Sequence, residues 1–252
     1  MGTILRSVFY GMGFFGRLIK GVGSFISRGQ ATRRILVMQI LFTFVEALGI
    51  ASLLALGIGA AVNAIGIPFL ASLSQDRLIY TLLITIITRE LGPLLTAFII
   101  IARSATAIAT EMAGMVISHE VEAYISVGVD PIEYLAVPRF LGVIISLFML
   151  NIFFSIFGLV GSYAVAQMFT PLPASVYFSN LLDILRFSDI FISMIKSIGF
   201  GIAISMVAII HGFSVERAST EVPIAGLKSV GAAFAWCISL DILLSAMYYI
   251  LA

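Results

Sequence analysis

The chain has 252 residues, of which 61% are hydrophobic and only 11% charged, and its mean hydropathy is +1.15. An average soluble domain contains roughly 25% charged residues, so this composition indicates an integral membrane protein. The formal net charge of +1 gives no reason to expect nucleic acid or an acidic partner. The single cysteine, Cys237, excludes an internal disulfide, and the length allows one domain of several helices.

The first 34 residues are too polar to span a bilayer, yet they have an apolar face. At 100° per residue the apolar side chains gather on one side of a helix and the basic ones on the other. We expect an amphipathic helix in the cytoplasmic headgroup layer, which several glycines could divide into two short pieces. A secretory signal is the competing interpretation, but those glycines interrupt its apolar stretch and no small-x-small cleavage site follows.

Five later stretches are apolar over the roughly 20 residues that a bilayer-spanning helix needs. The predicted fold class is therefore all-α, with the interfacial helix at 1–34 and a transmembrane domain at 35–252. The second stretch is too long for one straight helix, so it should tilt, break near Pro93 or project beyond the membrane at its Glu111 end. The predicted spans are about Ile35–Ile65, Leu78–Met112, Phe140–Met168, Ile190–Ile210 and Val230–Leu251.

Orientation follows from the basic residues, which accumulate on cytoplasmic flanks. Six of them precede the first span, so the N-terminus should be cytoplasmic and, after five spans, the C-terminus should lie outside. The loops at Ser74–Arg77 and Pro171–Asp189 would then be external, and those at Ile117–Arg139 and Gly212–Ser229 cytoplasmic. The six basic residues are Arg6, Arg17, Lys20, Arg28, Arg33 and Arg34.

The second span contains two adjacent charges, Arg89 and Glu90, followed by Gly92 and Pro93. Each ionised side chain costs roughly 2.5–3.5 kcal/mol at a bilayer centre, so such a pair should face a protein interior or a watery cavity. Pro93 removes a backbone donor, which predicts a kink beside the charges. The pair therefore indicates either a transport route or an internal ion pair, for which Lys196 and Asp241 are candidate partners.

Two further patterns lie downstream of this pair. Four alanines at helical spacing in the second span predict a ridge of small residues, where another helix could approach closely. The polar segment Ile117–Pro131 then predicts a short amphipathic helix on the cytoplasmic side, ended by Gly128 and Asp130. The alanines are Ala102, Ala105, Ala109 and Ala113.

Patterns for catalysis or cofactor binding are weak. The glycines between Gly11 and Gly16 have dinucleotide-loop spacing, but Arg33 and Arg34 stand where an acidic residue is needed. No phosphate-binding loop of the Walker type occurs, and His119-Glu120 lacks the second histidine of a zinc helix. We therefore expect no catalytic residue, metal or cofactor in this chain.

Several of these residues together resemble the MlaE/YrbE permease family, the membrane subunits of ABC transporters that work with MCE-domain proteins. The similarity is specific over Arg89–Arg139 and colinear but weaker elsewhere. It rests on Arg89-Glu90-Leu91-Gly92-Pro93, Ala102-Arg103, Ala109-x-Glu111-Met112, Gly128-Val129-Asp130-Pro131, Tyr134-Leu135-Ala136-Val137-Pro138-Arg139, Ile195-Lys196-Ser197 and Asp241. His119-Glu120 departs from the Glu-Gln that is common in the family, and 224–231 departs from its Gly-rich Ala-Thr-Thr stretch.

The resemblance implies a homodimer that encloses a lipid cavity in the bacterial inner membrane. It also implies a coupling helix at about 118–130 that docks on a separate ATPase, where ATP and Mg²⁺ would bind. The further partners would be a periplasmic MCE-domain protein, a small STAS-type regulatory subunit and phospholipid. The coupling residues would be His119, Glu120, Glu122, Tyr124 and Asp130.

The expected cargo is an amphiphile with an anionic head and apolar tails. Cations that could face its headgroup are Arg89, Arg103, Lys196 and Lys228, and an apolar wall would lie at the end of the first span, at Val62, Ile65, Phe69 and Leu70. These cations could instead pair with Glu46, Glu90, Glu111 and Asp241. Two other functions stay open: a proton-coupled secondary transporter using Glu90 or Asp241, and a lipid-modifying enzyme, for which no nucleophile or metal cluster is evident.

Overall fold

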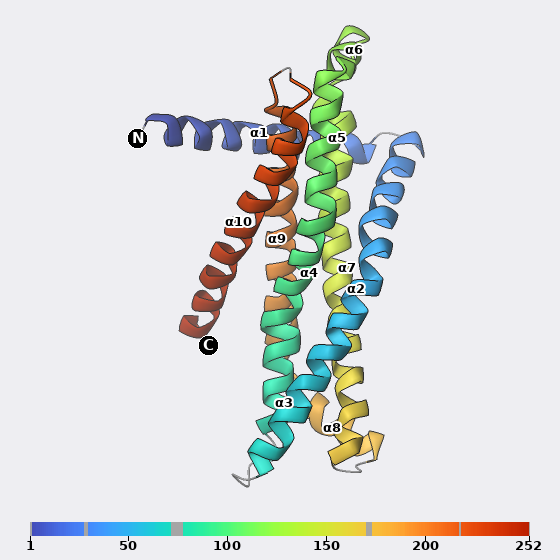
Figure 1. Ribbon diagram of the computed structural model, residues 1–252, viewed down its shortest axis with the longest axis vertical. Coiled ribbons are helices and arrows are strands. Elements are labelled where there is room, and N and C mark those ends of the chain that lie inside the picture. The colour runs from blue at the N-terminus through green and yellow to red at the C-terminus, as the bar shows by residue number, and fades with distance from the viewer. Residues whose placement is uncertain (1, 28–29, 72–77, 170–172, 217, 252) are drawn as a thin grey trace. The chain divides into compact units, whose positions relative to one another are not determined.

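The computed structural model describes residues 2–27, 30–71, 78–169, 173–216 and 218–251 (Figure 1). Within these ranges nearly every residue is helical and none forms a strand, which confirms the all-α fold class. The α-helices are α1 (Gly2–Ser27), α2 (Gln30–Ala71), α3 (Leu78–Leu83), α4 (Gly92–Ile100), α5 (Thr106–Ile117), α6 (Glu120–Ser126), α7 (Val137–Phe169), α8 (Ala174–Ile184), α9 (Phe187–Phe213) and α10 (Glu221–Leu251). Three π-helical segments are η1 (Ile84–Leu91), η2 (Ile101–Ala105) and η3 (Ile132–Ala136).

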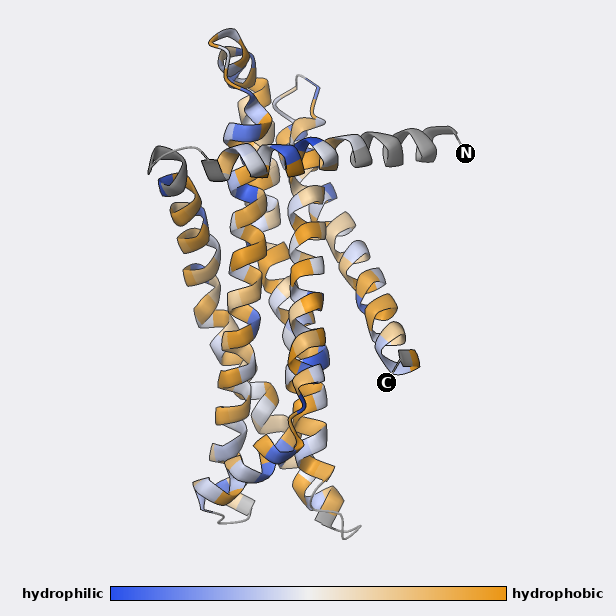
Figure 2. Cartoon of the chain, turned by 180° about the vertical axis from the view of Figure 1, so that it is seen from behind, coloured by the Kyte–Doolittle hydropathy of each residue, from blue (hydrophilic) through white to orange (hydrophobic). Residues whose placement is uncertain are grey.

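Five stretches of helix in the described part of the chain are long and apolar enough to cross a membrane, as predicted. Figure 2 shows the hydrophobic character of these long helices along most of their length. Both ends of each stretch lie within about ten residues of the boundaries expected from the sequence. The chain is therefore a multi-pass membrane protein. The stretches are Arg34–Leu70, Leu78–Ile117, Ile132–Met168, Phe187–Phe213 and Glu221–Ile250.

Of the three alternatives given for the long second span, the break near Pro93 does not occur, because the π-helical turns of η1 precede Pro93 and α4 continues the same helix. Two other local predictions were wrong. The fifth helix begins at Glu221, since Pro223 falls in its first turn, where a missing N–H is tolerated. The predicted loop Pro171–Asp189 contains helix α8, whereas the predicted loop Ser74–Arg77 lies entirely outside the described residues.

Helix α1 is one continuous helix, although its glycines had suggested two pieces. Phe14, Leu18 and Phe25 are buried along one face, and Arg17 and Lys20 are exposed on another. The Phe14 ring lies 6.3 Å from that of Phe213 in α9, and the Ser24 hydroxyl donates to Glu133 in η3. The predicted amphipathic periodicity is therefore present.

The chain divides into two compact units. The first comprises residues 1–43, 100–146 and 201–237. Three of the four ridge alanines, Ala105, Ala109 and Ala113, are fully buried in it, while Ala102 is exposed. Gly212 of α9 packs so tightly that a β-carbon there would lie 2.9 Å from the Ala109 carbonyl oxygen. The predicted close helix approach is thus confirmed for the buried part of the ridge.

The second unit comprises residues 44–99, 147–200 and 238–252. Helices α2 and α7 approach closely here, because Gly59 faces Gly158 and a β-carbon on Gly59 would overlap the Gly158 carbonyl oxygen at 2.2 Å. Leu83, Ile87 and Phe154 form part of its fully buried core. All residues of the candidate site described next belong to this unit.

Candidate functional site in the membrane-spanning helices

The sequence around Pro93 places two charges on a widened helical turn. Pro93 has no N–H to donate and its ring would clash with a carbonyl one turn earlier, so a regular α-helix is disfavoured before it. Segment η1 instead adopts π-helical turns and ends at Leu91, directly after Arg89 and Glu90. Single π-helical turns within α-helices are frequent at functional sites. The charges therefore lie where the backbone departs from regular geometry.

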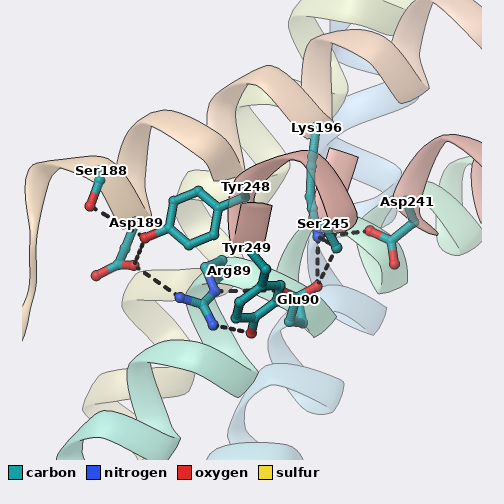
Figure 3. A network of polar contacts seen from close by, with 9 residues as sticks. All are labelled: Arg89, Glu90, Ser188, Asp189, Lys196, Asp241, Ser245, Tyr248 and Tyr249. Atoms are coloured by element: carbon teal, nitrogen blue, oxygen red, sulfur yellow. Dashed lines mark hydrogen bonds and ion pairs between the residues drawn. The ribbon is translucent and has the colours of Figure 1, made fainter. Parts of the chain in front are cut away.

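Lys196 of α9 is the centre of the polar network that Figure 3 shows. Its side chain is fully buried, and its ammonium donates to Glu90 Oε2 at 2.6 Å and to Ser245 Oγ at 2.7 Å. The ammonium also forms an ion pair with Asp241 Oδ1 at 2.9 Å. Ser245 donates to Glu90 Oε2 at 3.0 Å, so every polar group here has at least one partner.

Arg89 makes looser ionic contacts than Lys196. Its guanidinium lies 3.4 Å from Glu90 and 3.5 Å from Asp189, and it also donates to the Tyr249 hydroxyl. The guanidinium carbon is 4.9 Å from the ring centres of both Tyr248 and Tyr249, within cation–π range. Figure 3 shows the guanidinium between Asp189 and Tyr249. Two aromatic rings and two carboxylates therefore surround a cation that keeps 12% of its side chain exposed.

Asp189 is positioned by the start of α9. Its carboxylate accepts from the Arg186 backbone N–H at 3.2 Å, and its own N–H donates to the Arg186 carbonyl at 3.0 Å. The carboxylate thus caps an N–H at the start of the helix, and a negative charge is stabilised in the first turn of a helix. The other carboxylate oxygen accepts from the Tyr248 hydroxyl at 3.3 Å. Asp189 thus links the start of α9 to the network.

The network contains two cations and three carboxylates, a formal charge of −1 when all are ionised. Burying such groups is expensive unless they pair, and here Lys196 pairs with Glu90 and Asp241 as the sequence suggested. Sequence reasoning missed Asp189, Tyr248 and Tyr249. It assigned Asp189 to a loop, and two tyrosines at the end of an apolar span give no signal that they contact an arginine.

Other predicted site residues are not among the residues that make up this network. Arg103 and Lys228 belong to the first unit, and both are exposed. Glu111 pairs with Arg139 at 2.7 Å within that same unit. Of the apolar wall predicted in α2, Ile65 and Phe69 are 73% and 63% exposed, Val62 is half-buried and Leu70 is buried.

The predicted coupling segment contains α6, none of whose residues is buried. His119 precedes it in a left-handed conformation and its ring nitrogen lies 2.9 Å from Glu122 Oε2. Gly128, with φ of 77°, turns the chain after α6, and Asp130 Oδ1 accepts from the Ile132 N–H at 2.9 Å. Two apolar side chains, Ile125 and Val127, are 60% and 75% exposed. The segment therefore presents acidic and apolar groups together.

A second buried polar cluster in the same unit was not foreseen from the sequence. Asn63 donates to the Ser162 carbonyl and to the Tyr177 hydroxyl, the latter at 3.2 Å, and the Ser162 hydroxyl lies 2.9 Å from Tyr177. Burial raises the pKa of Tyr177 above its ordinary value, so its phenol stays protonated at neutral pH. Helix α8 is held in place by these contacts.

Comparison with known proteins places these features in context. Residues 36–247 match the family described as Permease MlaE. A probable ABC transporter permease protein of Rickettsia prowazekii is 28% identical over 179 residues, which are 71% of this chain and 69% of that protein. The intermembrane phospholipid transport system permease protein MlaE of Haemophilus influenzae is 26% identical over 230 residues, 90% of this chain and 88% of that protein. The chloroplastic protein TRIGALACTOSYLDIACYLGLYCEROL 1 of Arabidopsis thaliana is 25% identical over 224 residues, 89% of this chain and 64% of that protein.

Proposed function

The chain belongs to the MlaE permease family, and we propose that it is the membrane-spanning subunit of an ABC transporter that moves phospholipid between the inner membrane and an MCE-domain partner. The single observation that supports this most is the match to the family over 36–247, which includes all four charged residues anticipated for the network. The Haemophilus relative is named for phospholipid transport, which supports the same cargo here. The chain itself performs no chemistry in this proposal.

The two cations of the network have different proposed roles, one structural and one in lipid binding. Lys196 is fully buried and makes short contacts, so it holds α9, α10 and η1 together through Glu90 and Asp241. Arg89 has longer ion pairs and a partly exposed side chain, so it can exchange a carboxylate for a phosphate at small cost. Arg89 is therefore the headgroup contact, and Ile65 and Phe69 of α2 supply an apolar surface for the acyl chains.

Energy for transport comes from a separate ATPase that docks on the segment 118–130. The support is an exposed helix that offers two acidic residues, Glu120 and Glu122, beside the exposed Ile125 and Val127. Charge reversal at Glu120 and Glu122 is expected to reduce co-purification of the ATPase and to leave membrane insertion intact. Undiminished ATPase recovery together with undiminished transport would refute this docking assignment.

The subunit is proposed to be a homodimer in the bacterial inner membrane, with its N-terminus cytoplasmic. The support for the dimer is that the fifth and first spans bury the fewest residues within one chain. In the most apolar part of each span, 11% and 22% of the residues are buried, compared with 56% in the second span. The exposed Ile242, Leu243 and Met247 of α10 are available for a second copy or for lipid. A periplasmic MCE-domain protein and a small STAS-type subunit complete the proposed complex.

Site-specific photo-crosslinking tests the lipid path. Crosslinkers at Ile65, Phe69 and Arg89 should capture phospholipid in cells, and capture should fall when the ATPase is inactivated or deleted. A crosslinker at Val160 of α7, which is 52% exposed, serves as the control for bulk bilayer contact. Equal labelling at Val160 and at the three test positions would remove the support for a lipid path.

A proton-coupled transporter is the alternative function, because Glu90 and Asp241 are carboxylates within membrane-spanning helices, and such carboxylates form proton relays in pumps and transporters. The two functions differ in their energy source. In vesicles, a transporter of the proposed kind needs ATP and is indifferent to a proton ionophore, whereas the alternative is abolished by the ionophore and needs no ATPase.

A further inference from the structure

A widened turn, η3, joins the segment of the exposed helix α6 to the long helix α7. Pro138, the second residue of α7, has no N–H to donate to the Tyr134 carbonyl four residues earlier. The Val137 N–H donates to the Ile132 carbonyl, five residues back, which is the π-helical pattern. Such turns are rare, and they occur frequently at functional sites.

Helix α1 lies against one side of η3. Gly21 of α1 is buried, and a β-carbon there would lie 2.9 Å from Val137 Cγ2 and 3.5 Å from Glu133 Cγ. The Ser24 hydroxyl, almost one turn further along α1, donates to the Glu133 carboxylate. Because Gly21 has no side chain, the backbone of α1 can approach η3 closely. Gly21 and Ser24 thus fix α1 to η3.

Helix α6 contacts η3 through two tyrosines. The ring centre of Tyr124 in α6 lies 5.2 Å from that of Tyr134 in η3. Asp130 holds the chain between them: its Oδ1 accepts from the Ile132 N–H at 2.9 Å, and its carbonyl accepts from the Tyr134 N–H at 3.1 Å. Glu133 and Tyr134 are adjacent on a helical turn, so they point in different directions and contact different helices.

Helix α6 depends on such contacts for its position. It has seven residues, none of which is buried, and isolated helices shorter than about 12–15 residues are marginal in water. Its Tyr124 is half-buried, whereas Ile125 and Val127, two of the groups proposed for ATPase docking, are exposed. The placement of these docking groups therefore depends on how η3 holds Tyr124.

We propose that α1 positions the ATPase-docking segment through η3, with Gly21 and Ser24 as the positioning residues. Glu133 receives the contact from α1, and Tyr134 on the same turn supports Tyr124 of α6. This role rests on the ATPase docking proposed above. A displacement of α1 moves η3, and with it the surface that the ATPase binds, so an interfacial helix takes part in ATP-driven transport.

Two glycines of α1 provide matched variants. Gly21→Val places a branched side chain against η3, whereas Gly23→Val enters open space, because a β-carbon there has nothing within 4 Å. Both substitutions change the helix propensity of α1 equally. Titration of the ATPase onto the purified full chain should give much weaker binding for Gly21→Val than for Gly23→Val. Ser24→Ala should weaken binding by up to about tenfold, because it removes one hydrogen bond.

A spin label on α6 reports its position without the ATPase. The label is attached to a cysteine at the exposed Ser126, and the native Cys237 is buried and so protected from labelling. The spectrum should shift toward that of a mobile label in Gly21→Val and Tyr134→Ala. Tyr134→Phe keeps the ring, so it should retain the spectrum and the ATPase binding of the wild type. Thermal midpoints of the variants identify any that fail to fold.

Two results would overturn the proposal. One is a Ser126 label whose mobility is the same in Gly21→Val, Tyr134→Ala and the wild type. The other is equal ATPase binding by Gly21→Val and Gly23→Val. Failure of the ATPase to bind the wild-type chain would instead refute the docking proposed above, and the spectra of the spin label would then decide by themselves whether α1 positions α6.

Discussion

Replacement of Lys196 by methionine should destabilise the protein more than any other single change in the network. Methionine has a similar volume but no charge, so the substitution leaves the half-buried Asp241 without its cation and Glu90 with only the longer contact to Arg89 at 3.4 Å. Breaking a buried ion pair by removing one partner costs about 3–5 kcal/mol. For a protein of this length, each kcal/mol lowers the thermal midpoint by about 2–4 °C, which predicts a fall of roughly 6–20 °C.

The assay is thermal unfolding of the detergent-solubilised protein, compared with two other variants. Arg89→Gln should lower the midpoint much less, because its ion pairs are longer and its side chain is partly exposed. The triple variant Lys196→Met, Glu90→Gln and Asp241→Asn, which removes the charges together, should recover most of the loss. A midpoint for Lys196→Met equal to that of the wild type would refute the assignment of Lys196 as the centre of the buried network.

Two further predictions concern glycines with defined surroundings. Gly92→Ala should destabilise the second unit, because its β-carbon would lie 2.4 Å from the Ile87 carbonyl oxygen. Gly57→Ala is the control: its β-carbon would have nothing within 4 Å, so the variant should be neutral or stabilising by up to about 1 kcal/mol. Equal thermal midpoints for the two variants would contradict the packing described. Gly128→Ala forces a side chain into a left-handed conformation at about 1–2 kcal/mol, so it should weaken ATPase co-purification and lower the thermal midpoint by no more than about 2–8 °C. Full ATPase recovery would count against a role of this turn in docking.

The sequence predicted the membrane class and all five spans because long apolar runs have few alternatives in water. The buried face of α1 could be predicted in part, since Leu18 and Phe25 follow helical spacing, whereas Ile19, which the same pattern includes, is 53% exposed. Helix α8 was missed because its mixed composition between two spans is equally typical of a loop. The start of α10 was placed too late, at Val230 rather than Glu221, because Glu221 and Lys228 make the first part of this helix less apolar than the rest.

The candidate site was predicted only in part. Charges inside apolar spans require partners, so Lys196 and Asp241 could be named as candidates for Arg89 and Glu90. Which cation meets which carboxylate depends on how helices pack, and no periodicity in one chain encodes it. Arg89 accordingly pairs with Asp189 rather than Asp241, and π-helical turns precede Pro93, where a break was one of the alternatives considered.

The central claim is that this chain moves phospholipid when a partner ATPase hydrolyses ATP. Reconstitution of the purified chain with the ATPase into liposomes, followed by transfer of labelled phospholipid to or from an MCE-domain acceptor, measures this directly. The account predicts transfer that requires ATP, persists with a proton ionophore and slows in Arg89→Gln without loss of the folded protein. Transfer that proceeds without ATP and stops with the ionophore would contradict it.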